Sequence, residues 1–295
     1  MSDNSFKNAS VAIIGRPNVG KSTLLNTLLR DDVSIVSRRP QTTRHQIAGI
    51  FNQPNIQIVF YDTPGFQYKF KSNLNNIMNR TIKNIVPTVD VVLFVIEALK
   101  WDIRDLKELE RVKKNTNVFL IINKIDQVKD KTVFFPFVEN IKRQYTFSEI
   151  LLLSGIKKKS GEVLIGILKK YLSKGRPQYN QQSITDRSFD FIAAELIREQ
   201  LFSHLGDEIP YTSAVLIEAI DQSPKIISIK VVILVDKASH KGIVIGKKGF
   251  TLKKIVSDAR IRIQKKVSKK VFLQAWVKEQ PGWANSTSNL RLMGF

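Results

Sequence analysis

Short apolar runs alternate with longer amphipathic stretches along the first part of the chain. The runs have the length of buried strands and cover residues 11–14, 56–61, 89–96, 118–122 and 150–153. Helical spacing of apolar residues occupies the stretches between them, at residues 21–29, 73–86, 103–113, 135–145 and 162–172. This alternation predicts βαβ units, and therefore a mostly parallel sheet with helices on both faces. Residues 47–51 and 56–61 flank a turn, which adds an antiparallel edge strand and makes six strands.

A polar stretch separates this pattern from a second one. Residues 173–186 contain Gly175, Pro177 and a Gln/Ser/Thr cluster, and we interpret residues 176–186 as an interdomain linker. Beyond it the pattern predicts five elements in the order α-β-β-α-β, with room for a short helix before Gly246: residues 189–204, 213–220, 226–235, 251–264 and 270–277. We therefore predict an α/β domain over residues 1–175 and a smaller α+β domain with a basic C-terminal tail over residues 187–295.

Charge changes this picture by indicating acidic partners. The 295 residues include 47 Lys or Arg and 26 Asp or Glu, a net charge of +21. Residues 225–295 hold 16 of the basic and only 3 of the acidic residues, which favours nucleic acid over a merely solvated surface. The absence of Cys and the presence of only three His exclude disulfides, Cys nucleophiles and His/Cys zinc sites. With no signal-like or membrane-spanning run, we expect a cytoplasmic protein.

A phosphate-binding loop follows the first predicted strand and opens the first predicted helix. The pattern G-x-x-x-x-G-K-[ST] is matched by Gly15, Arg16, Pro17, Asn18, Val19, Gly20, Lys21 and Ser22. Glycines in such a loop let backbone N–H groups turn towards an anion, and the helix N-terminus adds partial positive charge. Lys21 is expected at the β- and γ-phosphates, and the Ser22 hydroxyl at Mg2+.

Two further segments supply candidate ligands for the metal and the γ-phosphate. Asp62-Thr63-Pro64-Gly65 follows a predicted strand, so the Asp62 carboxylate can reach Mg2+ and the Gly65 N–H can face the γ-phosphate. In the basic loop of residues 38–45, Thr43 is our choice for completing the Mg2+ shell and Thr42 is the alternative. The candidates for transition-state contacts are thus Lys21, Thr43 and Gly65, and those for metal ligation are Ser22, Thr43 and Asp62.

Asn123-Lys124-Ile125-Asp126 follows another buried strand and matches the base-reading element of GTPases. The Asp126 carboxylate can accept hydrogen bonds from guanine N1–H and the exocyclic amine, whereas adenine offers an acceptor at N1. Asn123 is expected to brace neighbouring loops, and the Lys124 stem to cover the base. Ser154-Gly155 stands where GTPases usually carry Ser-Ala, and a plain turn at a strand end remains an alternative there.

Phe66 follows Gly65, at a position where many small GTPases carry a Gln that orients the attacking water. A phenyl ring cannot orient water. Three alternatives remain open: slow hydrolysis, assistance by another group, or assistance by a potassium ion, K+.

Gly246-Lys247-Lys248-Gly249 lies between two predicted helices in the most basic part of the chain. That context suits a type II KH module, whose GxxG loop clamps the backbone of four nucleotides. Lys253 and Lys254 extend the basic surface, which contacts phosphates rather than base edges. The alternative is a tight turn on a basic domain that binds no RNA.

Together these segments resemble the Era family, bacterial GTPases of the TrmE-Era-EngA type with a C-terminal KH domain. GRPNVGKSTLLN, PQTTRH, DTPG, NKID, residues 198–219, VIGKKG and residues 289–295 stand in the order found in that family. The resemblance implies a P-loop GTPase domain, GTP and GDP as ligands, and binding of the 16S rRNA 3′ end during assembly of the small (30S) ribosomal subunit. It also implies peripheral association with the inner membrane, and we expect a monomer. The competing hypothesis is a binding protein in which nucleotide only supports the fold.

Overall fold

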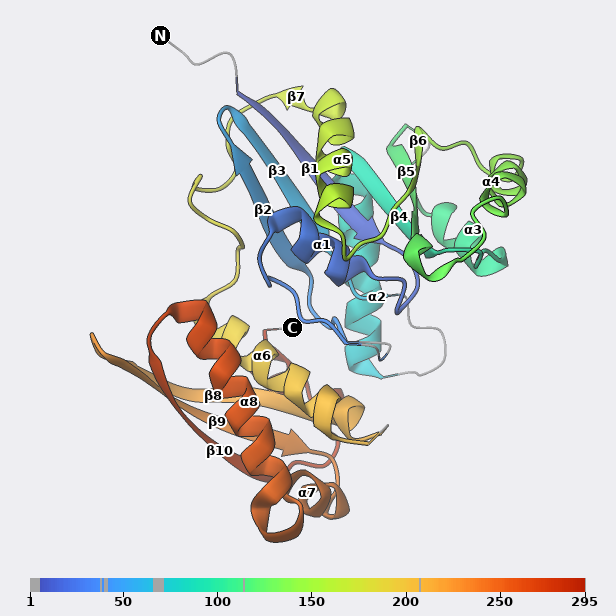
Figure 1. Ribbon diagram of the computed structural model, residues 1–295. Helices are drawn as coiled ribbons and strands as arrows, with labels where there is room; N and C mark the ends of the chain where they lie inside the picture. The colour runs from blue at the N-terminus through green and yellow to red at the C-terminus, as the bar shows by residue number, and fades with distance from the viewer. Residues whose placement is uncertain are drawn as a thin grey trace. The chain divides into compact units, whose positions relative to one another are not determined.

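The computed structural model describes residues 6–37, 39, 42–65, 72–113, 115–206 and 208–294 (Figure 1). The chain divides into two compact units. The first holds most of the chain up to Asp186, and the second begins at Arg187 and also takes in two short segments, one before Thr43 and one before Met78. Each unit has its own hydrophobic core.

A mostly parallel sheet forms the centre of the first unit. Its described strands are β1 (Lys7–Ile14), β2 (Ile47–Gln53), β3 (Ile56–Asp62), β4 (Val91–Glu97), β5 (Asn117–Asn123), β6 (Glu149–Leu152) and β7 (Ser173–Lys174). The order is β2-β3-β1-β4-β5-β6, with β2 antiparallel to β3 and β7 antiparallel to β1. The six expected strands are present, and the two-residue strand β7 is an addition to them.

Helices cover both faces of this sheet (Figure 1). Their bounds are α1 (Lys21–Leu29), α2 (Asn73–Ile85), α3 (Ile103–Leu109), α4 (Phe134–Lys142) and α5 (Lys158–Leu168). One apolar core includes side chains of α1 and α5, and the other includes side chains of α2, α3 and α4. The predicted helix over residues 162–172 was misplaced: α5 starts four residues earlier, because its polar first turn carries no apolar stripe. The helix predicted over residues 103–113 ends at Leu109.

The segment between β7 and Asp186 lies along the antiparallel edge of the sheet. The Ile50 N–H donates to the Ile184 carbonyl at 2.8 Å, and Gly49 pairs with Thr185 as an isolated bridge. The fully buried Gln57 accepts hydrogen bonds at Oε1 from the N–H groups of Gln178 (2.7 Å) and Tyr179 (3.0 Å). We call residues 176–186 the strap. It covers backbone groups of the sheet that an exposed edge strand would leave unpaired.

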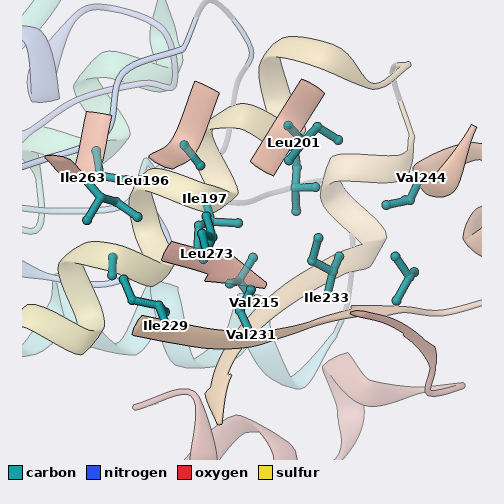
Figure 2. Packing of buried hydrophobic residues seen from close by; sticks show 14 of the residues in the cluster. Leu196, Ile197, Leu201, Val215, Ile229, Val231, Ile233, Val244, Ile263 and Leu273 are labelled. Carbon is teal, nitrogen blue, oxygen red and sulfur yellow. The ribbon is translucent and has the colours of Figure 1, made fainter. Parts of the chain in front are cut away.

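The second unit is a three-stranded sheet packed against helices. Its elements are α6 (Phe189–His204), β8 (Ser213–Gln222), β9 (Ile226–Val235), α7 (Ala238–Ile245), α8 (Phe250–Val267), β10 (Lys270–Glu279) and α9 (Thr287–Leu292). The strand order is β10-β9-β8, with β9 parallel to β10 and antiparallel to β8. Leu196 and Ile197 of α6 belong to the same buried cluster as Val231 and Ile233 of β9, and Figure 2 shows these side chains in the core. The short helix before Gly246 is present as α7.

The described part of the chain contains no helix that is both long and apolar enough to span a membrane.

Candidate nucleotide and RNA sites

The phosphate-binding loop connects β1 to α1 and depends on two glycines in unusual conformations. Gly15 has a φ of +136°, and a Cβ there would lie 2.2 Å from the Val95 carbonyl oxygen. Gly20 has a φ of +99°, and a Cβ there would lie 2.3 Å from Nδ2 of Asn123. A side chain at either position is excluded both by backbone strain and by lack of space. The glycines therefore hold the loop close to neighbouring strand ends.

Lys21 lies inside this loop. Its side chain is buried, and Nζ donates to the carbonyls of Gly15 (2.8 Å) and Arg16 (2.9 Å). Burial lowers the pKa of Lys21, against the opposing effect of the carboxylate of Asp62. The ammonium group is thus held by backbone carbonyls of the loop.

Arg16 points away from the loop towards the first turn of α3. Its guanidinium lies 2.7 Å from Oδ2 of Asp102 and 2.9 Å from Oδ1 of Asp105. These two acids also form the capping box of α3. The position was predicted as part of the nucleotide loop, and the structure shows that its side chain anchors the loop to α3.

Three oxygen-bearing side chains meet beside the P-loop: Ser22, Thr43 and Asp62. Ser22 Oγ lies 2.8 Å from Thr43 Oγ1 and donates to Oδ2 of Asp62 at 2.7 Å. Asp62 is fully buried, and burial raises the pKa of its carboxyl although hydrogen bonds from Ser22 and the charge of Lys21 oppose the shift. Its Oδ1 has no hydrogen-bond partner among the described residues.

This donor set fits Mg2+, a hard cation that takes oxygen ligands and keeps several waters and substrate phosphate oxygens in its shell. No group of three or more His, Cys, Asp or Glu side chains placed to hold a metal ion occurs in the described ranges. That result is consistent with a site of two hydroxyls and one carboxylate. The unpartnered Oδ1 of Asp62 gives the site an acceptor that is still available to a metal-bound water.

Thr42 and Thr43, the two candidates for completing the Mg2+ shell, make different contacts. Thr43 Oγ1 meets Ser22, whereas Thr42 Oγ1 donates to the Arg39 carbonyl at 2.8 Å. Of the two alternatives, the structure brings Thr43 to the oxygen cluster.

Sequence reasoning missed Ser34, which belongs to the same cluster. Its hydroxyl donates to Oδ2 of Asp62 at 2.8 Å, and the residue is buried. Asn26 of α1 accepts hydrogen bonds from the N–H groups of Val33 and Ser34 and so fixes this turn. A single Ser in an unpatterned loop carries no signal by which it could have been found.

The segment after β3 is held against the P-loop. The Thr63 hydroxyl donates to the Ile13 carbonyl at 2.8 Å, so it ties β3 to β1. A Cβ at Gly65 would lie 2.8 Å from the Pro17 nitrogen, so the backbone that follows Pro64 closely approaches the backbone of the P-loop. Phe66, to which the prediction of a missing catalytic Gln refers, lies outside the described residues.

Asn123, at the end of β5, links three loops. Its Nδ2 donates to the Val19 carbonyl at 2.8 Å, and its Oδ1 accepts from the Gly155 N–H at 2.7 Å. A Cβ at Gly155 would lie 3.0 Å from that Oδ1, a tight contact that gives a local reason for glycine instead of alanine. The turn after β6 is therefore fixed relative to the P-loop.

The remaining residues predicted to read the base are Asp126 and its neighbours in sequence and space. The Ser154 hydroxyl donates to Oδ1 of Asp126 at 2.5 Å, and the Asp126 side chain is otherwise exposed. Lys124 has a φ of +63°, and its Nζ lies 2.9 Å from Oε2 of Glu97. Ile125 begins a short 3-10 turn that carries Asp126. The structure thus brings the Asn123–Asp126 segment and Ser154 together at neighbouring strand ends.

The GxxG loop joins α7 to α8 in the second unit. Gly246 has a φ of +72°, and a Cβ there would lie 2.1 Å from Thr251 Oγ1. Gly249 has a φ of +77° with no atom within 4 Å of such a Cβ, so that position faces open space. The side chains of Lys247 and Lys248 are exposed between the two glycines.

Other residues around this loop extend or restrict the possible RNA surface. Lys253 and Lys254 are exposed on the first turns of α8. Phe250, which sequence reasoning did not single out, directly follows the loop and is 70% exposed. Trp283 is buried and donates from Nε1 to the Thr212 carbonyl, whereas Trp276 is 47% exposed.

Comparison with known proteins finds similarity over both units. The profile of the family described as "50S ribosome-binding GTPase" matches residues 10–124, and the KH domain profile matches residues 208–284. GTPase Era of Nitrosomonas eutropha is 40% identical over 295 residues, covering 100% of both chains. GTPase Era of Coxiella burnetii is 44% identical over 289 residues, covering 96% of both chains.

Two solved structures are similar over nearly the whole chain. A variant of Aquifex aeolicus Era bound to GDP and AlF4− superposes with a TM-score of 0.94 at 37% identity, covering 98% of this chain and 99% of the other. Era in complex with MgGDPNP and nucleotides 1506–1542 of 16S ribosomal RNA gives a TM-score of 0.93 at 37% identity, with the same coverage.

Proposed function

Because the chain belongs to the Era family of GTPases, we propose that it binds and hydrolyses GTP with Mg2+, binds 16S rRNA near its 3′ end through the KH domain, and acts in assembly of the 30S subunit. The observation that carries the proposal is that one chain holds both features. The first unit has the oxygen cluster of Ser22, Thr43 and Asp62, and the KH unit has an exposed GxxG loop.

The P-loop residues bind and orient the triphosphate in this proposal. The Lys21 ammonium pairs with the β- and γ-phosphates, and Ser22 and Thr43 supply hydroxyl oxygens to the metal while Asp62 accepts from its water. When bound, Mg2+ neutralises charge that develops on the transferred phosphoryl group. The Gly65 N–H donates to the γ-phosphate, and its close approach to Pro17 keeps that donor near the loop.

Guanine is held at the other end of the site. Asp126 accepts two hydrogen bonds from the base, and Ser154 orients the carboxylate by donating to Oδ1. Asn123 fixes the loops that meet at the base through Val19 and Gly155. An adenine ring would leave the Asp126 carboxylate facing an acceptor, so GTP is preferred.

Three alternatives remain for hydrolysis without the Gln that many small GTPases use. The reaction is slow and unassisted, or another group assists it, or K+ assists it. Turnover in K+ compared with Na+ at equal ionic strength separates the third from the others. A rate that depends on K+ supports the ion, and equal rates exclude it.

RNA binding is proposed for Gly246, Lys247, Lys248, Gly249, Lys253 and Lys254. A carboxylate in the open space at Gly249 would face the RNA backbone and repel its phosphates. Gly249→Asp should therefore weaken binding to the 16S rRNA 3′ end sharply and leave GTP affinity unchanged. Lys247→Ala with Lys248→Ala should weaken it less and lower the log–log salt slope by about 0.7 for each phosphate of single-stranded RNA that no longer binds a lysine.

The control for this experiment is Gly282→Asp, at a glycine that also has a positive φ and no atom within 4 Å of its would-be Cβ. Circular dichroism establishes that each variant is folded. Unchanged RNA affinity in Gly249→Asp would remove the KH assignment.

We further propose that the protein acts as a monomer in the cytoplasm and associates peripherally with the inner membrane. The net charge of +21 supports attraction to anionic lipid headgroups. Sedimentation with anionic and with neutral vesicles tests the membrane part, and sedimentation equilibrium tests the oligomeric state.

A further inference from the structure

A group of exposed cations lies on the first unit, away from the nucleotide loops. Residues 157–176 contain seven Lys or Arg and one Glu. Five exposed cations lie around β7, and we name them the β7 cluster: Lys7, Lys169, Lys170, Lys174 and Arg176. Figure 1 shows β7 at the upper end of the sheet, beside the end of α5.

The backbone holds these cations close together. Lys7 of β1 and Lys174 of β7 are direct partners in an antiparallel pair. The Gly175 N–H donates to the Phe6 carbonyl, and Nδ2 of Asn8 donates to the Arg176 carbonyl at 2.6 Å. Like charges directly opposite each other across two strands destabilise a sheet. The pairing therefore places two lysines directly opposite each other, at an electrostatic cost to the sheet.

Neighbouring carboxylates do not relieve this repulsion. Among the described residues, none of the five side chains forms an ion pair. On neighbouring elements, Asp90 accepts hydrogen bonds from the N–H and hydroxyl of Ser10, and Glu149 accepts one from the hydroxyl of Tyr171. The β7 cluster thus presents positive charge to an external polyanion.

We propose that the β7 cluster binds the phosphate backbone of RNA, as a second contact in addition to the GxxG loop. This inference rests on the proposed RNA-binding function and assigns part of it to the GTPase unit. Lys and Arg side chains contact phosphates without reading sequence, so the cluster adds affinity but no specificity. Binding to a bilayer surface draws on buried apolar area as well as charge. The exposed large hydrophobic residues of the described chain include none from residues 169–177, which favours RNA over lipid.

The cluster is separated from the nucleotide site by the length of β1. Lys7 begins this eight-residue strand and the P-loop follows its other end at Ile14, a span of about 25 Å at roughly 3.3 Å per residue. Substitutions in the cluster are therefore expected to leave GTP affinity unchanged, which makes the proposal separable from the nucleotide chemistry.

The test compares two variants with the same change in charge. The cluster variant is Lys169→Ala, Lys170→Ala, Lys174→Ala and Arg176→Ala. The control variant is Lys83→Ala, Lys107→Ala, Lys142→Ala and Arg143→Ala, on exposed positions of α2, α3 and the end of α4. The measurement is a salt titration of binding to full-length 16S rRNA. If each of the four cations binds one phosphate, the log–log slope should fall by about 3 in the cluster variant. The control variant should retain the wild-type slope.

Equal slopes for the two variants would overturn the inference. Gly249→Asp distinguishes this failure from failure of the proposed function: if that variant alone loses RNA affinity, the KH assignment stands and the β7 cluster is excluded. If neither variant changes RNA binding, both are wrong. A cluster variant that loses binding to anionic phospholipid vesicles but keeps its RNA slope would also overturn the inference, in favour of a lipid surface.

A second readout does not depend on RNA. Lys174→Thr removes the cross-strand repulsion with Lys7 and introduces a residue that favours strands. It should raise the midpoint of thermal unfolding of the free protein while weakening RNA binding. A lowered midpoint would contradict the argument that the adjacent lysines are held together against repulsion.

Discussion

At the scale of single residues, buried charges and amide groups set the geometry of the nucleotide site. Asn123 links the P-loop to the turn at Gly155, and Arg16 links it to Asp102 and Asp105. The motifs predicted which residues would gather. They did not predict that Arg16 points to α3, because the spacing of a loop sequence contains no information on side-chain direction.

Base preference gives the first prediction. Asp126→Asn replaces a pair of acceptors by one donor and one acceptor, a pattern that fits xanthine better than guanine. The variant should bind GTP more weakly and xanthosine triphosphate more tightly, as measured by competition for a labelled nucleotide. Asp130→Asn, on the same exposed loop, is the control and should behave as wild type. An unchanged preference in Asp126→Asn would mean that another residue reads the base.

The acids of α3 give a prediction for pH dependence. Burial raises the pKa of Asp105 above its ordinary value of 3.8, although a backbone hydrogen bond from Asp102 and the charge of Arg16 oppose this. Just above pH 3.8 the folded protein thus keeps a proton that the unfolded chain has released, and stability falls as pH rises through that range. Asp105→Asn should lack this decline, so its stability relative to wild type should increase with pH there and then level off.

Urea denaturation at a series of pH values measures this difference. Asp102→Asn is the control, because hydrogen bonds from Arg104 hold the pKa of Asp102 below its ordinary value. It should show no such trend above pH 3.8. A wild-type protein whose stability relative to Asp105→Asn rises through the same range would contradict the assignment.

At the scale of elements, strands were easier to predict than the segment that joins the two units. Buried apolar runs located β4, β5 and β9 to within two residues at each end, because full burial leaves a continuous apolar signal. The strap of residues 176–186 has no such signal. Its order comes from hydrogen bonds to β2 and to Gln57, a polar residue within a strand pattern whose partner lies about 120 residues away.

The strap gives a prediction about stability. Gln57→Ala removes the acceptor for two strap N–H groups and the donor to the Tyr179 carbonyl. It should lower the free energy of unfolding by about 2 kcal/mol, as expected for loss of buried hydrogen bonds. It should also speed proteolytic cleavage within residues 176–186. Gln53→Ala, at the exposed end of β2, should change neither measurement, and a strap that stays protected in Gln57→Ala would show that other contacts hold it.

At the scale of the whole molecule, two units with different chemistry share one chain. The first carries a P-loop with an oxygen cluster at the carboxyl ends of its strands, and the second carries a glycine loop among exposed lysines. Motif order along the sequence was sufficient to predict this division of chemistry. The β7 cluster was not predicted, because it forms only when Lys7 and Lys174 pair across β1 and β7.

The measurement that tests this account most directly is release of phosphate from GTP by wild-type protein and by Lys21→Ala, each with and without nucleotides 1506–1542 of 16S rRNA. Lys21 is buried in the P-loop, and its loss removes the cation that faces the phosphates. Circular dichroism and RNA affinity establish that the variant is folded. The account predicts turnover by the wild type, loss of turnover in Lys21→Ala, and RNA affinity retained in both. Equal phosphate release by the two proteins, or none by the wild type under any of these conditions, would contradict it.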